Sequence, residues 1–177
     1  MSGAWIFICG PSGAGKDSVI AAARQALSTR TDIVFARRMV TRAVQAGSEH
    51  DPVTEPQFHA LIAAGALRWR WQAHGFYYGI AEQYTAEVLA GRLVVVNGSR
   101  GHVSGLPASP DVRRVQITAD PHQLATRLAQ RCRDPADAIL ERLARNAQFS
   151  GMETDCVIVN NAELAVAAQR LADYLTA

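Results

Sequence analysis

The first candidate for chemistry is a glycine-rich loop near the N-terminus. Residues 10–16 match the pattern G-x-x-x-x-G-K, between an apolar run over 4–9 and an amphipathic segment from Asp17 to about Leu27. In such a strand–loop–helix unit, successive backbone N–H groups and the positive helix end bind phosphate oxygens, and the lysine adds a point charge. We therefore assign Lys16 a catalytic role and predict that ATP or GTP binds at Gly10, Pro11, Ser12, Gly13, Ala14, Gly15, Lys16, Asp17 and Ser18. Arg127, further along the chain, is assigned to the same nucleotide.

The residue that follows the lysine departs from the pattern. A Ser or Thr hydroxyl usually ligates Mg²⁺ there, but this chain has Asp17, with Ser18 one place later. A second departure is Asn97, which ends an apolar run over 93–96 where many such enzymes have an acidic residue. We hypothesise that Asp17 supplies the hard oxygen ligand for Mg²⁺. The alternative is that Asp17 only caps the helix and complements its dipole.

Composition excludes several classes of protein. The chain of 177 residues predicts a single domain, and 18 basic against 16 acidic residues leave a net charge of +2, which favours neither a nucleic-acid nor a membrane partner. The basic residues are 17 arginines and one lysine, Lys16. Three widely spaced cysteines form no CxxC pair, which is typical of core thiols in a reducing cytoplasm.

Alternating strand and helix patterns predict an open parallel α/β sheet with helices on both faces. Strands are expected over 4–9, 33–40, 67–73, 93–96, 112–118 and 156–159, and helices over 17–27, 55–64, 81–90, 120–132, 136–149 and 162–175, with 43–54 as a loop. The 67–73 strand has Trp69 and Trp71 on one face and belongs to a small appended unit in this prediction. Ligands in such folds bind at the carboxyl ends of the strands, so sites are expected after Cys9, Val40, Val96 and Thr118.

Several motifs resemble the guanylate kinase family, in that family's order and spacing. They are the loop 10–16, Thr41-Arg42, Gly47-Ser48-Glu49 and the run from His74 to Gly79. The resemblance implies a P-loop nucleoside-monophosphate-kinase-like fold with a core of 1–35 and 92–177. It also implies a small acceptor-binding α+β insert at about 36–91 and a mobile arginine lid at about 127–145. Arg42 and Tyr78 correspond to the residues that hold the acceptor phosphate in that family.

The positions that read guanine in that family do not match. Trp69 stands where the family has a glutamate, Ile80 where it has a hydroxyl residue, and 97–100 reads Asn-Gly-Ser-Arg in place of an aspartate region. These departures, with Lys16-Asp17-Ser18, are similar to the bacterial ribose 1,5-bisphosphate phosphokinases of phosphonate degradation. That resemblance implies that ATP, with Mg²⁺ as cofactor, phosphorylates ribose 1,5-bisphosphate to 5-phosphoribosyl 1-diphosphate. The substrate-binding residues are then Arg42, Glu49, Tyr78, Ser99 and Arg100.

A set of arginines follows the 112–118 strand and could close over the transferring phosphoryl group. Arg127 and Arg131 share one helix face by their spacing, as do Arg142 and Arg145, and Arg133 lies between the pairs. We assign catalytic roles to Arg131 and Arg142; a solvated helix face is the alternative for any one of them. Trp69 and Trp71 are better explained as core, His74 as structural, and His102 is open between the two interpretations.

Two other functions remain open at this point. One is a guanylate kinase-like nucleoside monophosphate kinase with altered base specificity. The other is a non-catalytic module that binds protein partners, against which the intact Gly15-Lys16 pair counts. The expected partners are ATP and a bisphosphorylated ribose, in a monomer or a homodimer.

Overall fold

The computed structural model describes residues 2–44, 49–130 and 151–177, and the side chains of 128–130 are also outside the description. A central parallel sheet has the strand order β2-β7-β1-β8-β9. Its strands are β1 (Ala4–Cys9), β2 (Ile33–Phe35), β7 (Leu93–Asn97), β8 (Val112–Thr118) and β9 (Cys156–Val159). The helices are α1 (Lys16–Ala26), α2 (Glu55–Ala63), α3 (Tyr84–Leu89), α4 (Arg100–Ser104), α5 (Pro121–Gln130) and α7 (Leu164–Thr176).

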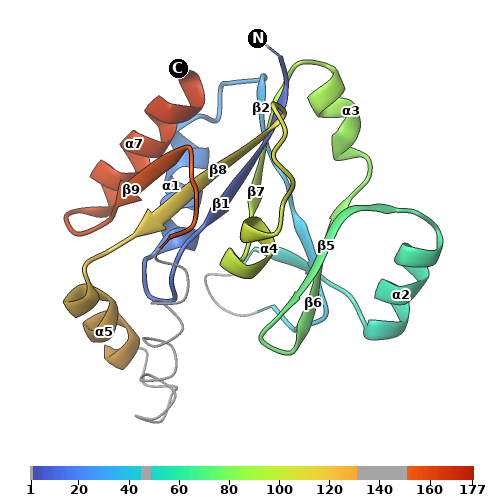
Figure 1. Cartoon of the computed structure of the whole chain (residues 1–177), viewed down its shortest axis with the longest axis horizontal. Coiled ribbons are helices and arrows are strands. Elements are labelled where there is room, and N and C mark those ends of the chain that lie inside the picture. The colour runs from blue at the N-terminus through green and yellow to red at the C-terminus, as the bar shows by residue number, and fades with distance from the viewer. Residues whose placement is uncertain (1, 45–48, 131–150) are drawn as a thin grey trace.

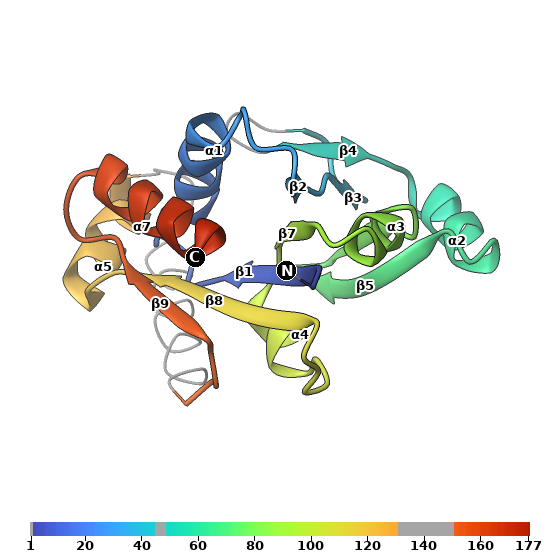
Figure 2. The same cartoon turned by 90° about the horizontal axis from the view of Figure 1, so that it is seen from above.

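Strand β1 is buried on both faces and separates two apolar clusters. Ile6 and Ile8 point into the cluster covered by α1 and α7, whereas Trp5 and Phe7 point into the opposite one, all at 0–1% exposure. Figure 2 shows α1 and α7 on one side of the sheet and α4 on the other. Alternate side chains of a strand point to opposite faces, so a continuous apolar run is what a doubly covered central strand requires.

A second, mixed sheet lies to one side of the central sheet with helix α2 (Figure 1). Its order is β4-β3-β6-β5, from β3 (Arg38–Val40), β4 (His50–Pro52), β5 (Leu67–Ala73) and β6 (Phe76–Ala81). His74 and Gly75 join β5 to β6, and their φ angles of 52° and 78° are those of a two-residue hairpin turn. Helix α2 begins with a capping box between Thr54 and Gln57. The predicted α/β architecture, with a parallel sheet and a small insert, is confirmed.

The prediction of a single strand over 33–40 is wrong. Strand β2 ends at Phe35 in the central sheet, and β3 begins at Arg38 in the second sheet. The backbone N–H of Ala36 still donates to Val95, but that of Arg37 donates to the Tyr84 hydroxyl at 3.0 Å. Two short strands in succession have the same alternation as one long strand, so the apolar pattern could not show that the chain changes sheets.

Other elements differ from the expectation in smaller ways. The predicted 43–54 loop contains β4, whose His, Asp and Pro residues have little strand propensity. Strand β6 and the short helix α4 were not predicted. The predicted helix over 136–149 and the end of the 120–132 helix lie outside the described residues. Within the described part of the chain, no helix is both long and apolar enough to cross a bilayer.

Candidate active site

The glycine-rich loop leaves the end of β1 and closes onto the first turn of α1. Gly13 and Gly15 have φ angles of 90° and 76°, a conformation that a side chain disfavours. A Cβ on Gly10 would lie 2.0 Å from the Ile117 carbonyl oxygen, so the loop passes directly against β8. These glycines give the loop the concave backbone that the sequence pattern predicts.

Asn160, directly after β9, holds the loop from the opposite side. Its side-chain amide donates to the Ala14 carbonyl at 2.8 Å, and its backbone N–H donates to Thr118 at 2.7 Å. The residue is 4% exposed, and its Nδ2 atom lies 2.7 Å from where a Cβ on Gly15 would be. Asn160 therefore connects the last strand to the phosphate loop, a role that sequence analysis did not assign.

Lys16, Asp17 and Asn97 form a three-way contact at the carboxyl edge of the sheet. Lys16 donates to the Asn97 side-chain oxygen and to Asp17 Oδ1, the latter at 3.2 Å. Asn97 Nδ2 in turn donates to the same Asp17 oxygen at 2.6 Å. Strands β1 and β7 are hydrogen-bonded neighbours in which Ile8 pairs with Asn97, which brings the two strand ends together.

The positive charge of Lys16 favours the ionised form of the Asp17 carboxylate. Burial alone would raise the pKa of Asp17, but the Lys16 cation and the Asn97 hydrogen bond outweigh burial and hold the pKa at about 2. Burial also lowers the pKa of Lys16, against the attraction of Asp17. Asp17 Oδ2 accepts no hydrogen bond from the described residues, so one carboxylate oxygen is available to a further ligand.

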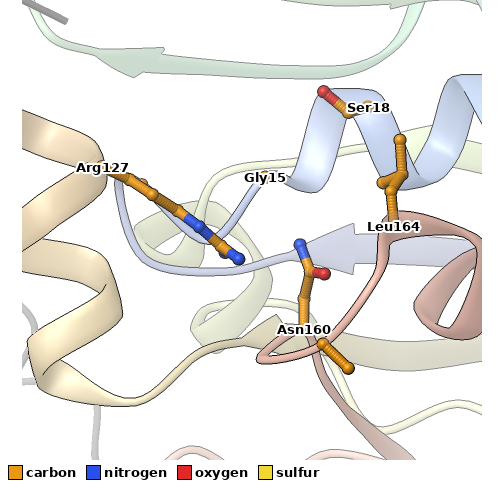
Figure 3. A pocket seen from close by; sticks show the side chains of 7 residues that line it. Gly15, Ser18, Arg127, Asn160 and Leu164 are labelled. Atoms are coloured by element: carbon orange, nitrogen blue, oxygen red, sulfur yellow. The ribbon is translucent and has the colours of Figure 1, made fainter. Parts of the chain in front are cut away.

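A cavity of about 360 Å³ lies on the α5 side of the loop. Gly13, Gly15, Ser18 and Asn160 line it together with Arg127, which extends from α5 toward Gly15 and Asn160 (Figure 3). Arg127 Nη1 is buried and has no hydrogen-bond partner among the described residues. The phosphate loop, Asn160 and Arg127, which is predicted to bind ATP, therefore line the same cavity.

A second cavity, of about 470 Å³, lies between α1 and the strands β2 and β3. Asp17 and Asn97 face it, so it adjoins the phosphate loop directly. Glu49 also lines it and forms an ion pair with Arg24 of α1. Arg38, which sequence analysis did not assign, contributes a guanidinium to the same space.

The other predicted acceptor residues, Arg42, Tyr78, Ser99 and Arg100, are not among the described residues that line this cavity. Tyr78 is 6% exposed on β6, and Arg42 follows β3 with its guanidinium 5.7 Å from the centre of the Phe76 ring. His50 donates from its ring to the Arg42 carbonyl at 2.9 Å and so holds the turn that carries Arg42. Ser99 caps α4 by accepting from the His102 N–H at 3.2 Å, and Arg100 begins that helix. Arg131 and Arg142 lie outside the described residues.

A series of stacked rings fills the space between the second sheet and the central sheet. Tyr78 stacks on Trp71 with centres 5.4 Å apart, and Trp71 stacks on His102 at 4.5 Å. Trp69 meets Phe7 of β1 edge to face at 5.2 Å. The core interpretation of the two tryptophans is confirmed, because both pack against the buried cluster of Trp5 and Phe7. His102, left open by the sequence, is part of the same stack.

Comparison with known proteins places this chain in a family, although no protein-family model matches it. The chain is 42% identical over 99% of its length to ribose 1,5-bisphosphate phosphokinase PhnN of Laribacter hongkongensis, of which it spans 43%. It is 38% identical over 98% of its length to the PhnN protein of Thiobacillus denitrificans, of which it spans 93%. The chain belongs to the ribose 1,5-bisphosphate phosphokinase family. This phosphokinase family membership accords with the resemblance carried by Lys16-Asp17-Ser18 and residues 96–100.

A solved structure shows that the fold is also that of guanylate kinases. Guanylate kinase from Anaplasma phagocytophilum superimposes with a TM-score of 0.75 over 99% of this chain and 85% of the other, at 20% identity. That likeness extends to the fold alone. This member of the phosphokinase family therefore has the guanylate kinase architecture that the sequence motifs predicted.

The hydrogen bond between Asn160 and the phosphate loop predicts that replacing Asn160 will destabilise the protein. Asn160→Ala leaves the buried Ala14 carbonyl without its donor, so the free energy of unfolding in urea should fall by about 1–3 kcal/mol. Gln169→Ala, which removes an exposed hydrogen bond within α7, should change it by less than about 0.5 kcal/mol. Equal effects of the two substitutions would contradict the assigned role of Asn160.

The buried imidazole of His102 predicts a sensitivity to acid. Burial lowers its pKa from the ordinary 6.5 to about 4, so the folded protein favours the neutral ring. The unfolded chain binds the proton more readily, and this contribution to stability is lost as the pH falls from about 6.5 toward 4. His102→Phe keeps a ring in the stack and removes the proton site. Between pH 7 and pH 5, the melting temperature of His102→Phe should fall less than that of the wild type. An equal fall in both proteins would contradict the destabilising protonation of His102.

Proposed function

We propose that this protein transfers the γ-phosphoryl group of ATP to the 1-phosphate of ribose 1,5-bisphosphate, forming 5-phosphoribosyl 1-diphosphate and ADP. The proposal rests on the second cavity, which is lined both by a residue next to the phosphate loop and by residues of the acceptor side. Asp17 lies in the first turn of α1, directly after the phosphate loop, and faces the cavity that Glu49 and Arg38 line, so donor and acceptor sites adjoin. Family membership supplies the substrate class.

The chemistry fits a site without a strong general base. The attacking group is an acceptor phosphate oxygen that is already ionised at neutral pH, so no proton has to be removed. Catalysis then consists of positioning and charge neutralisation. Lys16 and the loop amides hold the donor phosphates, and Arg42 with Tyr78 holds the acceptor phosphate. Arg131 and Arg142 stay predicted as the arginines that close over the transferring group.

The residues present also fit a magnesium ion. Asp17 is ionised, and its Oδ2 accepts no hydrogen bond from the described residues. Mg²⁺ at phosphoryl-transfer sites is held by one or two carboxylates together with substrate phosphates and water. In this proposal Asp17 is the protein ligand, and the ion neutralises charge on the phosphates when bound.

The aromatic stack supports an acceptor that has no base. Trp69 stands where a base-reading glutamate would be expected, and it is packed against Phe7 and Trp5. Ile80, in place of a hydroxyl residue, is fully buried. A purine placed there would leave its polar edge unpaired, at a cost of roughly 1–3 kcal/mol for each group. A role in phosphonate breakdown, a cytoplasmic location and the monomeric or dimeric state stay predictions.

An acceptor panel tests the proposed activity. ADP formation from ATP and Mg²⁺ should be fast with ribose 1,5-bisphosphate and at background with GMP and AMP. Lys16→Ala should lose at least about 10²-fold in kcat, since it removes the cation at the transferring charge. Arg170→Ala, an exposed change on α7, serves as the control with full activity. Turnover of GMP would instead favour a nucleoside monophosphate kinase.

The magnesium assignment has its own test. Asp17→Asn keeps the shape of the side chain and removes the charge, so the Mg²⁺ concentration for half-maximal activity should rise about tenfold or more. Asp32→Asn, which affects only a surface ion pair with Arg30, should leave the Mg²⁺ requirement unchanged. If Asp17→Asn retains full activity with an unchanged requirement, the magnesium assignment is wrong, and Asp17 acts only through the helix dipole and its contacts with Lys16 and Asn97.

A further inference from the structure

Arg38 lies where the chain passes from the central sheet into the second sheet. It is the first residue of β3, and it is half-buried at the cavity that Asp17 and Asn97 also line. The chain leaves the central sheet after β2 and enters the second sheet at β3. Arg38 therefore places a positive charge between the phosphate loop and the proposed acceptor site. No motif in the sequence distinguishes it from Arg37 beside it.

The arginines around this cavity differ in their partners. Arg37 binds Asp51 through two nitrogens at 2.7 and 2.9 Å, and Arg24 pairs with Glu49. Arg38 forms no hydrogen bond or ion pair with any of the described residues. The nitrogen atoms of its guanidinium therefore keep their donors for a ligand.

Arg38 is nevertheless held in place by an aromatic surface. Its guanidinium carbon lies 5.8 Å from the centre of the Tyr78 ring. Tyr78 is stacked on Trp71, which is stacked on His102 of α4. This support from the core orients the guanidinium without consuming its hydrogen bonds, as stacking on an aromatic face allows.

The burial of the Arg38 guanidinium favours an anionic ligand. Burial lowers its pKa, and the nearby Arg42 cation lowers it further, against the attraction of Asp17 and Tyr78. Asp17 itself is already shared with Lys16 and Asn97. The burial of Arg38 is therefore only partly compensated, and a phosphate bound beside it would supply the negative charge and hydrogen-bond acceptors that its guanidinium lacks.

We propose that Arg38 is a catalytic residue that binds the reacting phosphate of the acceptor, together with Arg42 and Tyr78. The inference rests on the proposed function. In the reaction an acceptor phosphate oxygen forms a bond to the γ-phosphorus. The bond from that phosphorus to the β-phosphate oxygen breaks, and ADP leaves with the electron pair. Arg38, beside Asp17, lowers the repulsion between the two phosphates as they approach.

The test compares Arg38→Gln with Arg68→Gln under saturating ATP and Mg²⁺. Arg68 also lies over an aromatic ring, that of Trp69 at 5.4 Å, but it is exposed and outside the cavity. Arg38→Gln should lower kcat/KM for ribose 1,5-bisphosphate about 10²-fold and kcat at least about tenfold. The KM for ATP should change by less than about twofold, and Arg68→Gln should match the wild type.

Arg38→Lys keeps the charge and loses the planar fork, so its kcat should lie between those of the wild type and Arg38→Gln. If Arg38→Gln fails to fold, a wild-type kcat in Arg38→Lys overturns the inference. A wild-type kcat in Arg38→Gln, or an effect confined to the KM for ATP, also overturns it. Failure of the unaltered enzyme to use ribose 1,5-bisphosphate would instead refute the proposed function, and the inference with it.

Discussion

The geometry of the site depends on the contact among Lys16, Asp17 and Asn97. A neutral amide at position 97 can do two things at once: its oxygen accepts from Lys16 while its N–H donates to Asp17. A carboxylate there could not donate, and it would repel Asp17. The two departures from the usual pattern, Asp17 and Asn97, therefore form one structural arrangement, with the carboxylate at the helix start and the amide at the strand end.

This arrangement has consequences on both sides of the loop. On the donor side, Asn160 holds the Ala14 carbonyl, and Arg127 faces the same cavity. On the acceptor side, the stack from His102 through Trp71 to Tyr78 connects the second sheet to helix α4. The second cavity is lined by Arg24, Arg37 and Arg38, whose charges suit the phosphate groups of the proposed acceptor. The guanylate kinase architecture is retained, and in the proposed function the acceptor is different.

The features predicted from the sequence are those whose signals are local. The loop pattern, the apolar run of β1 and the alternation of 67–73 each depend on neighbouring residues, and these elements are where they were expected. The role of Asn160 was not predicted, because its hydrogen-bond partner, Ala14, is 146 residues away in the sequence. The role of Arg38 was not predicted either, because nothing in the sequence separates it from the other 16 arginines. Its position at the cavity results from the change of sheets between Phe35 and Arg38. Long-range placement therefore decides the acceptor side of the site.

The most direct measurement of the central claim is phosphorus NMR of the product made from ATP, Mg²⁺ and ribose 1,5-bisphosphate. Transfer between phosphates, with no general base, predicts a new diphosphate on the anomeric carbon, seen as two coupled signals beside those of ADP. The 5-phosphate signal should remain that of a monoester. A new monoester on a ribose hydroxyl, or the release of inorganic phosphate alone, would contradict the account.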